Sequence, residues 1–329
     1  MTVPRRTFLQ FAVGAAALPA MSRLATAQAY PMRPITIVVP FAAGGGTDTI
    51  TRILAERMRA TLGQPIIVEN VSAAAGTVGV GRAARAPADG YTLSIGHLGT
   101  HVVNGAIYSL QYDLLKDFQP VALVSRASFL VTAKRSMPAN DLQGLIAWLK
   151  ANPDRASAGT AGVGSGEHVG GLLFQTVTGT RFQFVPYRGG GPAMQDLVAG
   201  QIDMMISGPA PALPQVRAGS IKAYAVAARS RLRAAPDIPT ADEAGAPGFY
   251  FPYWHALWAP KGTPSNVISK LNDAVMGALA DPAVRSRLEE LGHDTFPTEQ
   301  QTPAALGAYH QAEIEKWWPI IKAANIKAE

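Results

Sequence analysis

The sequence of 329 residues contains no cysteine. Disulfide bonds, thiolate zinc sites and cysteine nucleophiles are therefore excluded. Without covalent cross-links, the fold must be stabilised by the burial of apolar surface. A body of roughly 300 residues can provide this burial, either as one large domain or as two domains of about 150 residues each.

Acidic residues are absent from residues 1–29. Within this stretch Arg5 and Arg6 precede a short apolar run, and the last three residues are Ala-Gln-Ala. A positive start, a short apolar segment and small residues before a cleavage point are typical of a secretory signal peptide. The apolar run is too short for a membrane span, which needs about 20 residues. We therefore expect a signal peptide over 1–29 and a periplasmic mature chain that begins at Tyr30.

The signal peptide leaves two export routes open and changes the charge of the protein. Arg-Arg-Thr-Phe-Leu at 5–9 fits a twin-arginine signal, although Sec signals also carry paired arginines. Removal of 1–29 takes away three arginines and no acid, so the formal charge of +6 falls to +3. Lysine and arginine are scattered over the remainder, without the basic stripe that nucleic-acid binding needs. No other segment is long and apolar enough to cross a membrane, so we expect a soluble body.

The first part of the mature chain alternates between strands and helices. Short β-branched runs predict buried strands, and longer stretches with apolar residues at helical spacing predict helices between them. This order of elements predicts a parallel sheet covered by helices. The expected strands are 35–40, 66–69 and 91–95, and the expected helices are 47–60 and 76–86.

The alternation continues through the middle of the chain and ends in helices. A helix that stops at Asn152, before a proline, opens the second α/β unit. The unit continues with strands at 157–159, 182–185, 203–206 and 222–227 and with helices at 168–177 and 193–199. A strand at 254–259 and helices at 265–280, 281–291 and 302–324 follow. Two α/β units with a returning C-terminal segment suit a two-lobed binding fold, with the ligand where strand ends and helix starts meet.

A glycine-rich loop at 40–48 lies between a predicted strand and a predicted helix. Three consecutive glycines permit a tight turn, and the helix start adds unpaired N–H groups and a positive dipole end, which together suit an anion. No Lys-Ser/Thr pair follows the glycines, so this is not a Walker loop. Asp48 is interpreted either as a cap of this helix or as a direct ligand.

A second glycine-rich loop spans 159–168. It lacks the third glycine of the dinucleotide fingerprint, and Ser165 is not in a Gly-x-Ser-x-Gly elbow. The hydroxyls of Thr160 and Ser165 are therefore interpreted as hydrogen-bond donors rather than nucleophiles. His168 could be a packed residue or a ligand.

Three further segments leave alternatives open. In the third glycine-rich loop, 185–192, Arg188 could hold a carboxylate with two hydrogen bonds, pair across the lobes or face water. The small residues of 70–77 suit either close backbone approach to a ligand or helix packing. His97 and His101 are four residues apart, but no glutamate accompanies them, and the glycines at 96 and 99 argue against a helix there. We therefore expect no metal site.

The chain from Tyr30 onward resembles the Bug-type periplasmic solute receptors of tripartite tricarboxylate transporters. The matching text includes Pro-Phe-Ala-Ala-Gly-Gly-Gly-Thr-Asp at 40–48 and Pro-Ala-Asp-Gly-Tyr-Thr-Leu at 87–93. Further matches lie at 30–35, 112–118, 159–168, 185–191, 200–203 and 239–245. Each segment is modest alone, and their order over 300 residues is specific.

The resemblance implies a two-lobed Venus-flytrap fold of type II-like α/β topology, in which each lobe is a mixed sheet flanked by helices. The first lobe would comprise 30–130 and 254–329, and the second 131–253. The chain would be a monomer without cofactor or enzymatic activity, holding a small organic carboxylate for membrane permease subunits. The residues expected at the ligand are Phe41, Ala43, Gly45, Gly46, Thr47, Asp48, Gly76, Thr160, Gly162, Gly164, Ser165, His168, Tyr187, Arg188 and Asp203.

Two departures from the family pattern bear on specificity. Where the family often has a glycine-rich run, this chain has three alanines before Gly76. The methyl groups of these alanines would narrow the site. His255 follows Trp254 where an aromatic residue is common. Two other functions remain open: an orphan sensor that contacts a signalling kinase, and an exported hydrolase that uses Ser165, His168 and a carboxylate.

Overall fold

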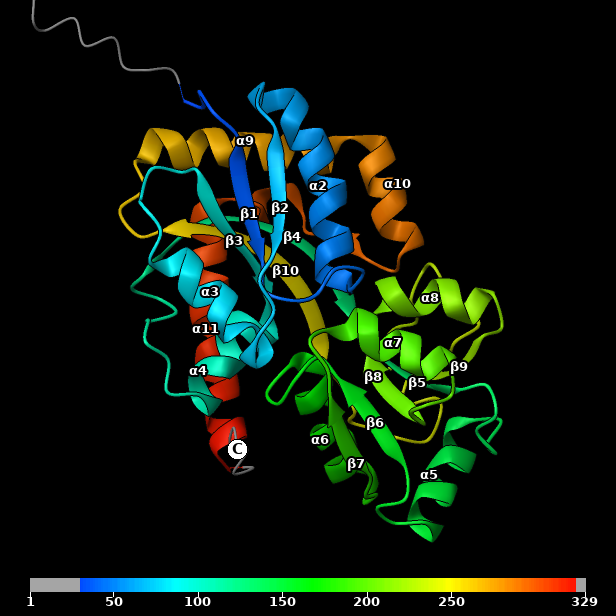
Figure 1. Cartoon of the computed structure of the whole chain (residues 1–329). Helices are drawn as coiled ribbons and strands as arrows, with labels where there is room; N and C mark the ends of the chain where they lie inside the picture. The colour runs from blue at the N-terminus through cyan, green and yellow to red at the C-terminus, as the bar shows by residue number, and fades with distance from the viewer. Residues whose placement is uncertain (1–29, 324–329) are drawn as a thin grey trace, which may run out of the picture. The chain divides into compact units, whose positions relative to one another are not determined.

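The computed structural model describes residues 30–323, and a compact unit that begins at Arg33 contains both sheets. The expected signal peptide, and the last residue of the helix expected at 302–324, lie outside the described residues. The unit contains two mixed β-sheets, each flanked by helices (Figure 1). The expected two-lobed α/β fold is confirmed.

The first sheet has six strands in the order β11-β4-β10-β3-β1-β2. The N-terminal strands β1, β2 and β3 run parallel, as the alternating pattern predicts. β10 returns from the C-terminal part and pairs antiparallel with β3 and β4, which makes the sheet mixed. The bounds are β1 (Ile35–Val39), β2 (Ile66–Asn70), β3 (Thr92–His97), β4 (Phe118–Ser128), β10 (Pro252–Pro260) and β11 (Asp294–Thr295).

Helices cover both faces of the first sheet. Helix α2 buries Ile50, Leu54 and Met58, which lie at helical spacing, and ends where Gly63 adopts a left-handed φ of 67°. Figure 1 shows α2, α9 and α10 on one side and α3, α4 and α11 on the other. Their bounds are α2 (Gly46–Leu62), α3 (Thr77–Ala84), α4 (Asn104–Ile107), α9 (Ser265–Ala280), α10 (Pro282–Glu290) and α11 (Pro303–Ala323).

The second sheet has five strands in the order β7-β6-β8-β5-β9. β6 runs parallel to β7 and β8, whereas β5 pairs antiparallel with β8 and β9. The strands are β5 (Leu130–Lys134), β6 (Ser157–Thr160), β7 (Gln183–Pro186), β8 (Met204–Ser207) and β9 (Ile221–Val226). The helices are α5 (Leu142–Ala151), α6 (Gly166–Thr178), α7 (Gly190–Val198) and α8 (Pro209–Arg217).

The glycines at 96 and 99 argue against a helix in this segment, and that expectation is wrong for the residues from Gly99 onward. A five-residue π-helix, Gly99–Val103, leads directly into α4. The side chain of Thr100 accepts a hydrogen bond from the main-chain N–H of His97 at 3.0 Å, and the residues of this turn are buried. Tertiary packing therefore stabilises a short helical turn that glycine content alone disfavours. The sequence reading also missed β4, β5 and α8.

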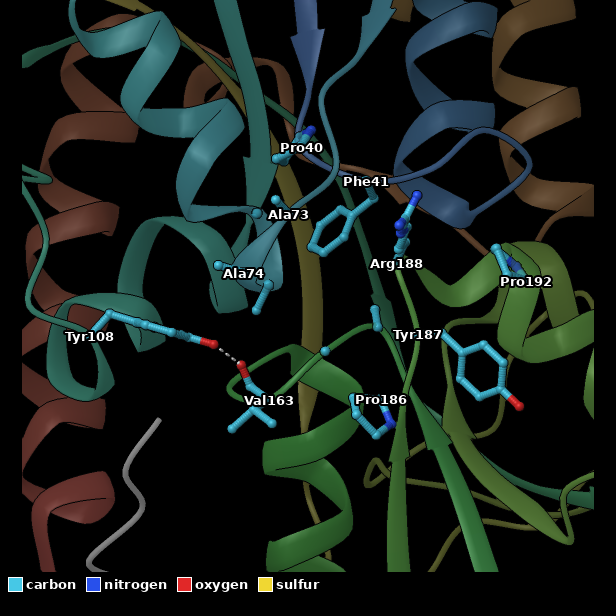
Figure 2. Close-up of a pocket in the computed structure, with 14 residues that line it drawn as sticks. Pro40, Phe41, Ala73, Ala74, Tyr108, Val163, Pro186, Tyr187, Arg188 and Pro192 are labelled. Carbon is cyan, nitrogen blue, oxygen red and sulfur yellow. Dashed lines mark hydrogen bonds between the residues drawn. The ribbon is translucent and has the colours of Figure 1, made fainter. Parts of the chain in front are cut away.

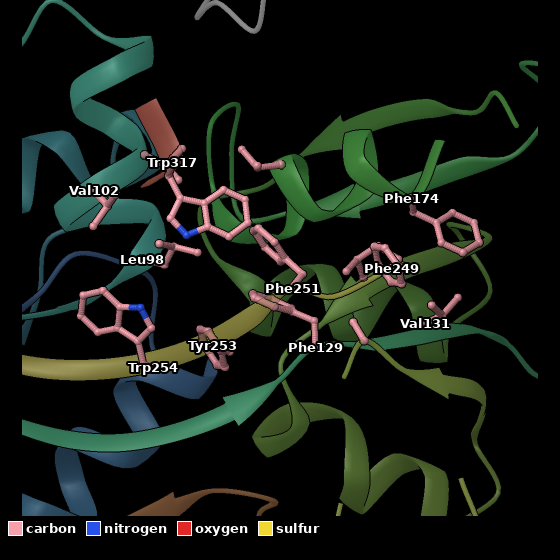
Figure 3. Close-up of a cluster of buried hydrophobic side chains, with 14 of the residues drawn as sticks. Leu98, Val102, Phe129, Val131, Phe174, Phe249, Phe251, Tyr253, Trp254 and Trp317 are labelled. Carbon is pink, nitrogen blue, oxygen red and sulfur yellow. The ribbon is translucent and has the colours of Figure 1, made fainter. Parts of the chain in front are cut away.

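The two sheets share one apolar core where the chain passes between them. The first passage lies at Phe129, between β4 and β5, and the second precedes β10. The Phe129 ring lies 5.1 Å from that of Phe251 and 4.6 Å from that of Tyr253. Figure 3 shows these rings between Trp254 on one side and Phe174 on the other. The passages are therefore packed aromatic segments rather than solvated linkers.

Acid should destabilise this fold because all six histidines are buried. Burial lowers the pKa of His97 and His293 to about 3 and that of His168 to about 4. Since the unfolded chain binds these protons near pH 6.5, stability is complete above that pH and declines below it. At pH 5 the loss is about 2 kcal/mol for each histidine that stays neutral in the fold.

Urea unfolding of residues 30–329 at pH 7.5 and pH 5.0 measures this loss. We expect a clearly lower unfolding midpoint at pH 5.0 with an unchanged slope. Equal midpoints at the two pH values would show that the histidines are solvated.

Candidate functional site

A cavity of about 650 Å³ lies between the two sheets, at the ends of parallel strands and the starts of helices (Figure 2). Loops that follow β1, β2, β6 and β7 all reach it. Its wall is mainly apolar and backbone, as is common for small-molecule sites. From the first sheet it is lined by Pro40, Phe41, Ala73, Ala74, Ala75, Gly76 and Tyr108, and from the second by Ala161, Gly162, Val163, Pro186, Tyr187, Arg188 and Pro192.

Three contacts join the two sides of this cavity. The N–H of Ala42 donates a hydrogen bond to the carbonyl of Arg188 at 3.1 Å. The hydroxyl of Tyr108 donates to the carbonyl of Val163, the contact drawn as a dashed line in Figure 2. A methyl group built on Gly162 would lie 3.2 Å from the N atom of Ala75. The glycine-rich loops of the two sides therefore meet closely.

The first glycine-rich loop leads into α2, whose N-cap is Gly45 and not Asp48. Gly45 has no side chain that could cap this helix, and the first N–H groups of an α-helix have no intrahelical partner. The Asp48 carboxylate instead accepts from the Gly44 N–H at 3.0 Å and forms an ion pair with Arg52 at 2.9 Å. Burial would raise the pKa of Asp48, but these bonds and one from Asn70 outweigh it and hold the pKa below its ordinary value. Asp48 shapes the loop.

Thr47 begins a chain of buried side chains behind the loop. Its hydroxyl lies 3.2 Å from Nε2 of His255, whose Nδ1 lies 3.4 Å from the hydroxyl of Ser125. Ser125 lies in turn 3.2 Å from Nδ1 of His293. Burial keeps the pKa of His255 well below its ordinary value, so this histidine is neutral. This series of hydrogen-bonded side chains connects the start of α2 to strands β4 and β10.

The second glycine-rich loop is organised by its own side chains. Ser165 is the N-cap of α6 and accepts from the N–H of His168 at 3.3 Å. The hydroxyl of Thr160 accepts from the Gly162 N–H at 3.3 Å, and Nδ1 of His168 accepts from the Gly164 N–H at 3.1 Å. Ser165 and the ring of His168 therefore form no nucleophile–base pair. His168 positions the loop.

The third glycine-rich loop contributes backbone atoms and the guanidinium group of Arg188 to the cavity region. The carbonyl of Arg188 contacts Ala42, while its side chain is exposed, and no ion pair of this guanidinium occurs within residues 30–323. Tyr187 donates from its hydroxyl to Asp196 at 2.6 Å, so the hydroxyl points away from the cavity (Figure 2). A methyl group on Gly191 would lie 3.0 Å from the carbonyl oxygen of Ala43. Only glycine permits this approach.

The alanine segment of the wall has an unusual backbone. Ala74 and Ala75 have φ values of 44° and 49°, a left-handed conformation that costs a non-glycine residue about 1–2 kcal/mol. Asn104 holds this turn by donating to the carbonyl of Ala75 at 2.9 Å. Two adjacent residues in this conformation at a cavity wall are typical of a functional site.

The expected site residues fall into three groups. Phe41, Gly76, Gly162, Tyr187 and Arg188 line the cavity, whereas Asp203 is bound to Lys134 at 2.6 Å and to Ser157. The third group belongs to the cavity-forming loops without lining the cavity: Ala43, Gly45, Gly46, Thr47, Asp48, Thr160, Gly164, Ser165 and His168.

Tyr108 was missed from the sequence because no motif surrounds it. The π-helix that precedes its turn carries it to the cavity. Within the described residues, no three or more histidine, aspartate or glutamate side chains are arranged to hold a metal ion. Over the same residues, no helix has both the length and the apolar character of a membrane span.

The two sheets, the shared core and the cavity at the helix starts define a two-lobed α/β fold of the periplasmic-binding-protein type. The family model described as the tripartite tricarboxylate transporter family receptor, TctC, matches residues 50–326, and the chain belongs to this family.

Solved structures agree with this assignment. The periplasmic binding protein BugD is 38% identical with a TM-score of 0.88, over 91% of this chain and all of that protein. MatC from Rhodopseudomonas palustris, solved with bound malate, is 42% identical with a TM-score of 0.86, over 89% of this chain and 100% of MatC. Another R. palustris protein, solved with adipate, is 32% identical with a TM-score of 0.86, over 91% of this chain and 100% of its own length.

The cavity wall predicts opposite responses at two neighbouring positions. Ala75→Gly relieves left-handed strain and adds freedom to the unfolded chain, so its free energy of unfolding should stay within about 1 kcal/mol of the parent. Gly76→Ala should cost about 2 kcal/mol or more, because its methyl group would lie 2.8 Å from Thr100 and 3.0 Å from Pro40. Urea unfolding of both variants measures the difference, and equal stabilities would contradict the described turn.

Proposed function

We propose that this chain is a periplasmic solute-binding protein that captures a small organic carboxylate and delivers it to the membrane subunits of a tripartite tricarboxylate transporter. The observation that carries the proposal is the convergence of three glycine-rich strand-to-helix loops on one cavity. Export would remove residues 1–29. The first lobe would comprise 30–130 and 254–329, and the second 131–253.

Helix starts supply the attraction for the anion. The first N–H groups of α2, α6 and α7 have no partner within their helices, and each helix dipole places a partial positive charge at this end. Such a site can bind a carboxylate without a buried arginine or lysine. Arg188, at the edge of the cavity, adds an exposed positive charge. The relatives solved with malate and adipate support a carboxylate as the solute class.

Closure of the lobes would follow from the same contacts. A solute held by loops of both sides binds the closed arrangement better than any open one, and therefore shifts the population toward it. The Ala42–Arg188 and Tyr108–Val163 hydrogen bonds would form in that closed state. The separation of Ser165 from a catalytic base favours capture over hydrolysis.

A thermal-shift screen tests the proposed function. Mono-, di- and tricarboxylates, aromatic acids and amino acids are added to residues 30–329, and at least one acid should raise the melting temperature. A ligand at 100 times its Kd stabilises a folded protein by about 2.7 kcal/mol. Absence of a shift with every acid, together with measurable hydrolytic turnover, would contradict capture.

Position 45 offers a matched pair of variants for locating the site. A methyl group on Gly45 meets only ordinary contacts, the nearest being the Gly191 N atom at 3.5 Å, so Gly45→Ala should fold and close. Gly45→Val adds two more methyl groups at the junction with α7 and should abolish the shift without unfolding the chain. An unchanged acid affinity in Gly45→Val would place the site elsewhere.

A further inference from the structure

Glu167 lies in the first turn of α6, beside the loops that meet at the cavity. Its Oε1 atom would lie 3.1 Å from a methyl group on Gly190, which sits between the cavity-lining residues Arg188 and Pro192. The residue itself is half-buried, but its Oε2 atom is closed off from solvent and has no hydrogen-bond partner in the part of the chain that the structure describes. Glu167 does not itself line the cavity, so its carboxyl group lies behind the cavity wall, in the first turn of α6 and close to the start of α7.

Among residues 30–323, no cation neutralises this carboxyl group. Burial raises the pKa of Glu167 to about 7, its own backbone N–H and Ser165 oppose the rise through hydrogen bonds, and no lysine or arginine contributes. An unpaired carboxylate at a buried position is costly, and a proton removes the cost. Near neutral pH the closed structure therefore holds Glu167 partly as the uncharged acid.

The other titratable groups around Glu167 stay uncharged in the same pH range. On its own helix, burial lowers the pKa of His168 to about 4. From β10, Tyr253 faces it with a pKa that burial raises above its ordinary value. Behind Tyr253, His97 has a pKa lowered to about 3 by burial. From α7 the neighbour is the backbone of Gly190, which does not titrate.

We propose that Glu167 is a specificity-determining residue of this site, whose carboxylate disfavours doubly charged acids unless it takes up a proton when the lobes close. The proposal rests on the proposed function, because it concerns the acid that this site captures. An ionised Glu167 repels a bound dianion about twice as strongly as a monoanion. The cleft should therefore prefer singly charged acids at alkaline pH and accept dicarboxylates as the pH falls.

Calorimetry tests the proposal. It measures the affinities of the parent and of Glu167→Gln for L-malate and for L-lactate, at pH 6.0 and at pH 8.5. Malate carries two carboxylates and lactate one. At pH 8.5 the variant should bind malate about tenfold more tightly than the parent, and lactate about threefold more tightly. At pH 6.0 parent and variant should agree within about twofold. Glu299→Gln, an exposed glutamate far along the chain, is the matched control and should leave both affinities unchanged.

The melting temperatures of the parent and of Glu167→Gln, measured without a ligand at two pH values, test the buried carboxyl group separately. The folded pKa of Glu167, about 7, lies above the ordinary value of 4.5. The stability that its proton provides is complete below 4.5 and is lost as the pH rises through 7. Glu167→Gln should therefore melt at the same temperature as the parent near pH 5 and higher at pH 8.5, by on the order of 5 °C.

The outcomes separate this inference from the proposed function. A melting difference that does not vary with pH would overturn the buried, unpaired carboxyl group and leave acid capture untouched. Equal malate affinities of parent and Glu167→Gln at pH 8.5 would overturn the specificity assignment. Absence of binding by every acid in the screen, with the melting difference as expected, would overturn the proposed function and the acid selection with it.

Discussion

The close approach of two backbones governs the rest of this structure. Loop 40–48 and loop 185–192 meet where the Ala42 N–H reaches the Arg188 carbonyl at 3.1 Å and where Gly191 lies against Ala43. A side chain larger than hydrogen at position 191 would press against the backbone of Ala43 and Gly44 and hold the loops apart. Glycine at position 191 is therefore a requirement of the junction, and the starts of α2 and α7 that meet there carry the unpaired N–H groups that attract anions.

A buried polar framework holds these loops in position. Thr47, His255, Ser125 and His293 connect the start of α2 to the strands that pass between the sheets, while His168 fixes the Gly164 N–H. Such groups contribute little net stability when paired and cost much when unpaired. These side chains serve mainly to orient the loops. Because the hydrogen bonds depend on neutral histidines, we expect acid to destabilise the fold. Acid has the opposite effect at Glu167: protonation removes the unpaired negative charge and so stabilises the fold there.

Sequence reasoning located the fold and the loops better than the side chains of the site. Helix α9 was predicted with the bounds it has, because its apolar spacing is regular and local. Strand β4, the π-helix at Gly99–Val103 and Tyr108 were missed, since each depends on contacts with distant segments. Asp48 and Glu167 show the same limit. The sequence identifies an acid near a helix start, but only the packed structure shows that Asp48 has partners for its charge and that Oε2 of Glu167 lacks one.

A crystal structure of residues 30–329 with an acid that stabilises the protein is the most direct test of capture between the lobes. We predict that the carboxylate lies inside the cavity, within hydrogen-bond distance of backbone N–H groups at the starts of α2 and of α6 or α7, with the Ala42–Arg188 contact formed. A carboxylate bound outside the cavity, or held by the Arg188 side chain without backbone contacts, would contradict it.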